Sequence, residues 1–176
     1  MSLVKSLSVL IVAAAAALAA LPASSQTSSL KGHNSDAPVD VAADRIEVQD
    51  RADRAIFSGN VVVRQAGLTL NAARLTVAYS SAGGIQIERI DASGGVVVRS
   101  PSETARGRFA IYDLQKRIIT LIGGVTLVRG ASNVSGGRLV LDLDSGRAVM
   151  DGGGAPGTTN SGGRVTGSFT VPKRGG

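Results

Sequence analysis

The side chains that could support catalysis are few in this 176-residue chain and lie far apart. His33 is the single histidine and there is no cysteine, so no histidine-based triad or histidine–cysteine metal cluster can form. The 13 acidic residues show no marked pair placed for glycoside hydrolysis, and there is no P-loop. We therefore expect neither an enzyme nor a bound cofactor, and we expect His33 to be a solvated linker residue.

Two short motifs have the spacing of a ligand site. Asp142 and Asp144 share one side of a predicted strand, but the further ligands of a calcium loop are missing, so an exposed strand face is favoured. Gly152, Gly154 and Gly157 match a dinucleotide-binding pattern, yet a proline lies inside it and no helical pattern follows. Both motifs are better explained as strand and loop.

Arginines recur at nearly regular intervals and are the remaining candidates for chemistry. Arg45, Arg74, Arg108 and Arg138 each precede a run of alternating apolar residues. Guanidinium groups bind phosphate through paired hydrogen bonds, so the four could form a cationic rim for phosphates. A solvated outer face would explain the same arginines equally well.

The elements that would position these arginines are short β-strands. Runs rich in β-branched residues, separated by Gly, Asn, Asp and Ser, extend from Val39 to Asp151 without a sustained helical period. A glycine that leads into an apolar strand recurs at Gly59, Gly94 and Gly123. The pattern predicts an all-β fold of about four repeated strand groups, which bury their apolar faces by stacking into an elongated structure.

Alternation along these strands separates an inner from an outer face. Medium-sized aliphatic side chains dominate the inner face and can leave a slot for acyl chains, although on pattern alone a filled core is favoured. The predicted inner, lipid-binding residues are Ile46, Val48, Phe57, Val61, Val63, Leu75, Val77, Val96, Val98, Phe109, Ile111, Leu121, Val125, Leu127, Leu139 and Leu141.

The segments outside the β-region have their own signatures. Residues 1–25 combine Lys5, an apolar run and small residues at 23–25, which predicts a secretory signal peptide cleaved near residues 23–25. The apolar run is shorter than the roughly 20 residues of a spanning helix, so a retained anchor is disfavoured. Residues 26–38 are expected to be a polar lead-in, 152–163 a Gly-rich loop, and 164–176 a terminal strand and tail.

The net charge limits the partners that are expected. The chain carries +6, and its basic residues are spread singly with almost no aromatic side chains beside them. A nucleic-acid partner is therefore not expected. Anionic lipid or phosphorylated glycolipid fits the charge better.

Four short segments follow one another along the predicted strands: FSGNVVV at 57–63, ARLTV at 73–77, LIGGVTL at 121–127 and SNVSGGRL at 132–139. In these segments the chain resembles the LptA (OstA-like) family of periplasmic lipopolysaccharide-transport proteins, and the similarity covers residues 36–151. The resemblance implies a twisted, partly open antiparallel β-jellyroll over residues 39–151. The Gly-rich segment 152–163 interrupts the family pattern, which leaves the pairing of the last strand open.

The family also implies a function. Acyl chains of lipopolysaccharide would occupy the aliphatic trough, and the protein would carry or bridge lipopolysaccharide from the inner to the outer membrane. Its partners would be the anchored periplasmic subunit of the inner-membrane transport complex, the outer-membrane translocon and further copies of itself, joined head to tail. A structural or adhesive β-solenoid with a filled core and no ligand is the alternative.

Overall fold

One antiparallel β-sheet makes up nearly all of the computed structural model, which describes residues 33–153 and 163–170. The all-β prediction is thus confirmed. Within these residues no helix is long and apolar enough to cross a membrane. In chain order the elements are β1 (Asp40–Ala42), β2 (Arg45–Gln49), the short 3-10 helix η1 (Asp50–Ala52), β3 (Arg54–Gln65), β4 (Leu68–Ser80), β5 (Gln86–Arg99), β6 (Glu103–Asp113), β7 (Ile118–Arg129), β8 (Ser132–Asp142), β9 (Ala148–Asp151) and β10 (Thr166–Ser168).

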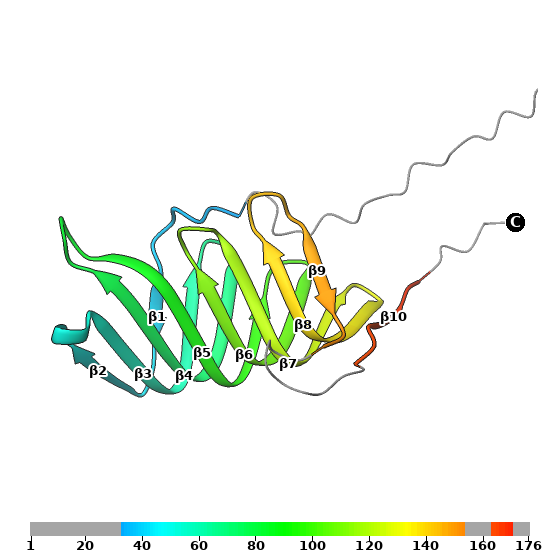
Figure 1. Ribbon diagram of the computed structural model, residues 1–176, viewed down its shortest axis with the longest axis horizontal. Coiled ribbons are helices and arrows are strands. Elements are labelled where there is room, and N and C mark those ends of the chain that lie inside the picture. Colours follow the sequence, from blue (N-terminus) through cyan, green and yellow to red (C-terminus); the bar gives the residue numbers. More distant parts are fainter. Residues whose placement is uncertain (1–32, 154–162, 171–176) are drawn as a thin grey trace, which may run out of the picture.

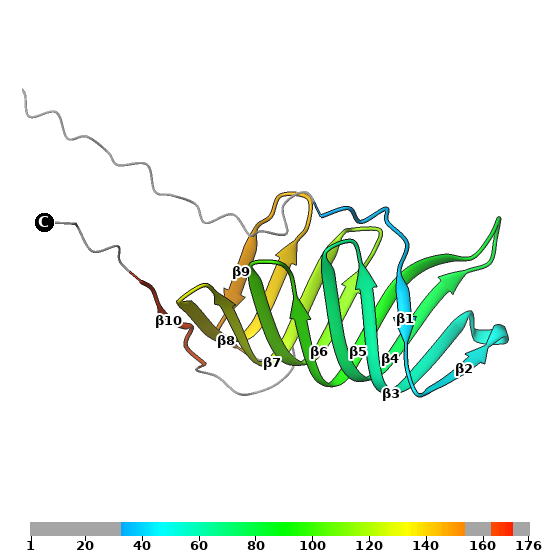
Figure 2. The same cartoon turned by 180° about the vertical axis from the view of Figure 1, so that it is seen from behind.

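The six long strands β3 to β8 pair in chain order as an antiparallel meander. Each is bent near its middle, so the sheet folds over and two halves face each other, as Figures 1 and 2 show. Each terminal long strand therefore has two short edge partners, one in each half. β1 and β2 both pair with β3, and β9 and β10 both pair with β8. The last strand, whose pairing the sequence left open, joins the sheet.

Glycines make the bends. The pairing register shifts between Ser58 and Val61 in β3, and again at the glycine pairs 94–95 in β5 and 123–124 in β7. Both residues of each pair have positive φ, for example 84° at Gly94 and 82° at Gly95. Glycine adopts this conformation without steric cost, and the resulting bulge turns the strand without ending its ladder. The sequence pattern had suggested short strands separated at these glycines; the strands instead run through them.

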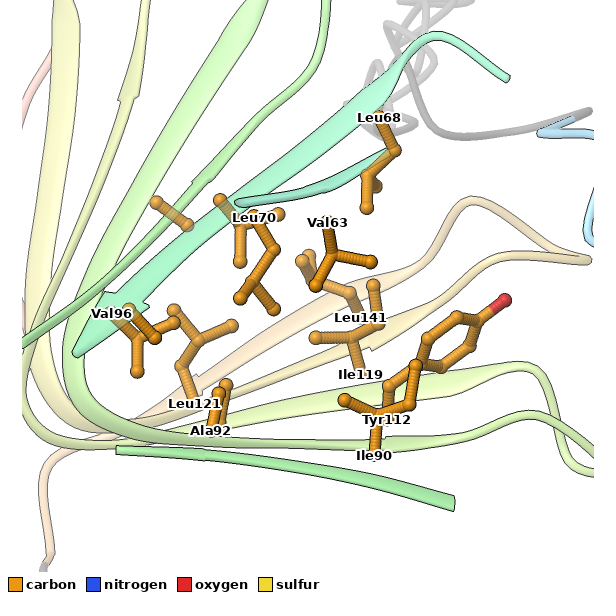
Figure 3. Close-up of a cluster of buried hydrophobic side chains, with 14 of the residues drawn as sticks. Val63, Leu68, Leu70, Ile90, Ala92, Val96, Tyr112, Ile119, Leu121 and Leu141 are labelled. Carbon is orange, nitrogen blue, oxygen red and sulfur yellow. The ribbon is translucent and has the colours of Figure 1, made fainter. Parts of the chain in front are cut away.

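The two inner faces pack against each other and form the core. Figure 3 shows Val63, Leu70 and Val96 from one half pointing toward Ile119 and Leu121 from the other. Leu121 is fully buried, as is Leu75. Burial of each such side chain contributes about 1.5–3 kcal/mol, so this apolar contact is the main force that holds the halves together.

Two residues expected in the interior lie outside it. Phe109 is 51% exposed, and Ile111 also points outward. Ala110, which lies between them in the strand, and Tyr112, which follows Ile111, are buried. Strand β6 has apolar residues at both parities, so alternation alone could not choose a face. The register decides it, because Ala110 lies opposite Ala92 in β5 and Leu121 in β7, both of which point inward.

The register predicts unequal costs for two aliphatic truncations. Leu121→Ala should lower the free energy of unfolding by roughly 2–5 kcal/mol, because it leaves a cavity in the core. Ile111→Ala on the outer face should cost less than about 1 kcal/mol. Urea denaturation of both variants checks this, and a larger loss for Ile111→Ala would show that β6 faces the other way.

A glycine pair at the bend offers a second test. A Cβ on Gly94 would lie 2.6 Å from the Cβ of Ala73, whereas a Cβ on Gly95 meets nothing within 4 Å. Both alanine substitutions impose the same positive φ, a strain of about 1–2 kcal/mol. Gly94→Ala should destabilise further, by roughly 1–3 kcal/mol, because of the overlap.

The matched control for this pair is Ala73→Gly, combined with Gly94→Ala. Removal of the Ala73 methyl group should recover the excess cost in thermal or urea melts, and it should do nothing for Gly95→Ala. Equal costs for the two glycines would contradict the close approach at the bend.

Candidate functional site

The interior between the two halves is a continuous apolar surface. Of the predicted inner residues, ten are buried there, and Phe57 and Leu127 are partly buried and packed against them. These ten are Val61, Val63, Leu75, Val77, Val96, Val98, Leu121, Val125, Leu139 and Leu141. These side chains are all aliphatic, and they suit the apolar parts of a ligand.

The interior is nearly filled in this state. A hollow of about 160 Å³ lies toward the C-terminal end, between β7, β8, β9 and the segment after β10. Leu127, Leu139 and Met150 contribute to its wall, and Phe169 closes one side. A ligand with several acyl chains would therefore have to part the two halves.

The N-terminal end of the interior is uncovered. Ile46 and Val48 lie opposite Phe57 and Ala55 in the ladder, so they share the inner face. They were predicted to be inner residues, but β2 is the edge strand of its half and each is 57% exposed. The apolar surface thus continues to the end of the sheet.

Residues 33–38, which we call the strap, lie across the mouth where the two halves diverge. In Figure 1 the chain runs along the side opposite the bends before it enters β1. His33 was predicted to be a solvated linker residue, but it is half-buried and its Nε2 lies 3.2 Å from Gln65 Oε1. Residues 26–32 of the predicted lead-in lie outside the described residues, as does the predicted signal peptide.

Gln65 holds the strap in place. Its side chain is only 2% exposed, and Nε2 donates to the carbonyl oxygens of Ser35 (2.8 Å) and Ala37 (3.0 Å). Tyr112 from the opposite half donates its hydroxyl proton to Gln65 Oε1 at 3.0 Å. Burial raises the pKa of Tyr112, so the phenol stays protonated and able to donate. One amide therefore joins the strap to both halves of the sheet.

Ion pairs add a second, more exposed connection at the mouth. Arg117, in the turn between β6 and β7, binds Asp36 of the strap and Asp144, each at 3.1 Å. Asp142 accepts hydrogen bonds from the backbone N–H groups of Asp144 and Ser145, which lower the pKa of its carboxyl. The two aspartates singled out in the sequence thus shape a turn and anchor an arginine. Exposed pairs of this kind contribute about 0–1 kcal/mol each.

Sequence reasoning missed the polar members of the interior. Glu103 is buried and forms an ion pair with Arg129 on the neighbouring strand. Gln65 lies two residues after the inward Val63, and Glu103 lies two residues before the inward Ala105. Alternation along the strands therefore places both on the inner face. The signal is the alternation itself, which applies to polar side chains as well as to the aliphatic ones from which the inner face was predicted.

The repeated arginines do not border the interior. Arg45 lies opposite Ser58, Ser58 opposite Arg74, and Arg74 opposite Ser93, so these residues form one row on the outer face beside the bends. Arg138 belongs to the same row, with Asp151 at 3.7 Å, and Arg108 is exposed at the bend of β6. Each arginine of the row precedes an inward residue, and successive side chains in a strand point to opposite faces.

Comparison with known proteins agrees with this architecture. The model of the family described as LptA/(LptD N-terminal domain) LPS transport protein matches residues 40–147. An uncharacterized protein of Rhizobium meliloti (strain 1021) is 34% identical over 125 residues, which are 67% of each chain.

A solved structure shares the fold. LptH, described as the LptA homologous periplasmic component of the conserved lipopolysaccharide transport device from Pseudomonas aeruginosa, superposes with a TM-score of 0.69 and 18% identity. The match covers 79% of this chain and 99% of LptH. At this identity the likeness concerns the fold alone, and it confirms the predicted jellyroll-like sheet.

The strap gives a testable prediction. Gln65→Leu keeps a similar side-chain volume but removes the hydrogen bonds that Gln65 makes to His33, the strap and Tyr112, and it leaves the carbonyl oxygens of Ser35 and Ala37 without their donor. We expect a loss of roughly 1–3 kcal/mol in the free energy of unfolding and faster amide hydrogen exchange at residues 33–38. Gln49→Leu, at a more exposed amide, is the control and should change neither quantity. Unchanged exchange in Gln65→Leu would mean that other contacts hold the strap.

Proposed function

Because the chain belongs to the LptA/(LptD N-terminal domain) family of lipopolysaccharide-transport proteins, we propose that it binds lipopolysaccharide in the periplasm and carries or bridges it from the inner to the outer membrane. The proposed role is that of a carrier without catalytic activity. The observation that supports it best is the continuous apolar interior between two halves of one bent sheet. Acyl chains would lie there, and the sugars and phosphates would stay outside.

Entry would proceed through the mouth. No backbone ladder joins the two halves on that side in the described residues, so parting them breaks apolar contacts and the hydrogen bonds of Gln65 rather than strand pairs. Acyl chains that enter would replace the lost contacts at about 0.8 kcal/mol per buried CH₂ group. Arg117 and Arg129 are placed near the mouth and could contact phosphates, unlike the outer row of arginines.

The two ends of the sheet would serve the partners. β1 and β2 at one end and β9 and β10 at the other leave backbone groups along their outer edges, which readily pair with another strand. Head-to-tail pairing between copies would join the uncovered Ile46 and Val48 to the hollow beside Phe169 and so extend one apolar path. The same edges would meet the anchored periplasmic subunit and the outer-membrane translocon.

One observation favours a second candidate. The interior is filled in the described state, as expected for a structural or adhesive β-solenoid that takes no ligand. The two candidates differ in whether lipid ever reaches the inner face.

Site-specific photo-crosslinking in cells separates the two. A photoreactive residue at Val63 or Leu127 on the inner face should capture lipopolysaccharide, and one at Arg64 or Arg99 on the outer face should not. Depletion of the protein should in addition leave newly made lipopolysaccharide at the inner membrane. Capture confined to the outward positions would contradict a lipid-binding interior.

A further inference from the structure

A second hollow lies on the outside of the sheet. It has a volume of about 740 Å³, compared with 160 Å³ for the hollow inside. Its floor is the outer face of β4 to β7, where Thr76, Phe109, Ile111 and Ile122 lie. We call it the outer groove. Its volume falls within the range of about 300–1,000 Å³ that is typical of small-molecule sites.

The apolar floor of the outer groove is not needed for the core. Phe109 lies opposite Ile122 in the ladder and is 51% exposed. The inward positions of the same strands are already occupied by Ala110, Tyr112 and Leu121, all buried. An aromatic ring and two isoleucines grouped on a solvent-facing sheet are typical of a binding surface.

The polar edge of the groove is positively charged. Arg74 and Arg108 line it, and within residues 33–153 and 163–170 neither side chain forms an ion pair or side-chain hydrogen bond. Asp91 also borders the groove, but Arg89 binds its carboxylate at 2.7 Å. Two guanidinium groups that have no carboxylate partner among the described residues, beside an apolar floor, match a ligand that is anionic at one end and apolar at the other.

We propose that the outer groove binds a single-chain anionic lipid. Its carboxylate or phosphate binds at the edge that Arg74 and Arg108 line, and its acyl chain lies over Phe109, Ile111 and Ile122. Gly152 and Gly163 border the groove and are packed together so closely that a Cβ on Gly152 would overlap the carbonyl oxygen of Gly163. This site is separate from the interior, because the lipopolysaccharide of the proposed function would contact the opposite face of the same strands.

The test uses dodecyl phosphate as the probe, below its micellar concentration, with isothermal titration calorimetry on the full chain. Dodecyltrimethylammonium has the same alkyl chain and the opposite charge, and it should bind at least about tenfold more weakly. The double variant Arg74→Gln/Arg108→Gln and the variant Phe109→Ser should each weaken dodecyl phosphate binding by about tenfold or more. Because these side chains are exposed, the urea midpoints should stay close to that of the parent.

Matched controls lie elsewhere on the exposed surface. Arg64→Gln removes an outward arginine in the other half of the sheet, and Ile85→Ser removes an exposed aliphatic side chain from a turn. Both should bind dodecyl phosphate like the parent. Lipopolysaccharide capture at Val63 should also persist in the groove variants, so a failure here is distinct from a failure of the proposed transport role.

Three outcomes would overturn the proposal. Unchanged affinity in the groove variants would place the probe at another site. Equal affinity for the two amphiphiles would remove the role of the arginines. Binding to vesicles of anionic phospholipid that depends on Phe109, without binding of monomeric dodecyl phosphate, would make this face a membrane contact and not a lipid groove.

Discussion

The fold depends on bends inside strands that stay hydrogen-bonded. Paired residues with positive φ, such as Gly94–Gly95 and Gly123–Gly124, turn β5 and β7 while their ladders resume on the other side. A single meander can therefore supply both walls of its own interior. The row of inward residues, the outer row with Arg74, and the paired edge strands at each end all follow from this geometry.

The same geometry decides how the interior can open. The bend side is closed by continuous strands, whereas the mouth is held by side chains and by the strap at residues 33–38. Gln65 is central there, because its buried amide bonds to the strap and to Tyr112 of the opposite half. Polar groups in a low-dielectric site form strong hydrogen bonds when all are satisfied, and they are costly when one partner leaves. Closure of the mouth is thus specific, yet it involves few residues.

The sequence predicted the class of fold and most of the inner face, since alternation marks burial wherever one parity is polar. It failed where both parities are apolar, as at Phe109 and Ala110, because only the cross-strand register decides between them. It also treated Gly94 as a turn signal, since glycine at a bulge and glycine in a hairpin look alike locally. Contacts distant in sequence, such as Gln65 with Tyr112 and with the strap, leave no local pattern at all.

The two apolar surfaces differ in what a ligand must do to reach them. The interior is nearly filled, so the proposed ligand would bind there only in an opened state, and its apparent affinity would fall by the fraction of molecules that are open. The outer groove is a hollow of about 740 Å³ on the outside of the described sheet, so the proposed lipid would bind there without parting the two halves. A protein that must both accept a lipid and give it up benefits from the first arrangement. The free energy needed to open the interior lowers the affinity for the lipid, and the same free energy is recovered when the lipid leaves and the interior closes. Under the proposed transport role, opening would break the apolar contacts between the two halves as well as the hydrogen bonds of Gln65, and the burial of acyl chains would have to offset both.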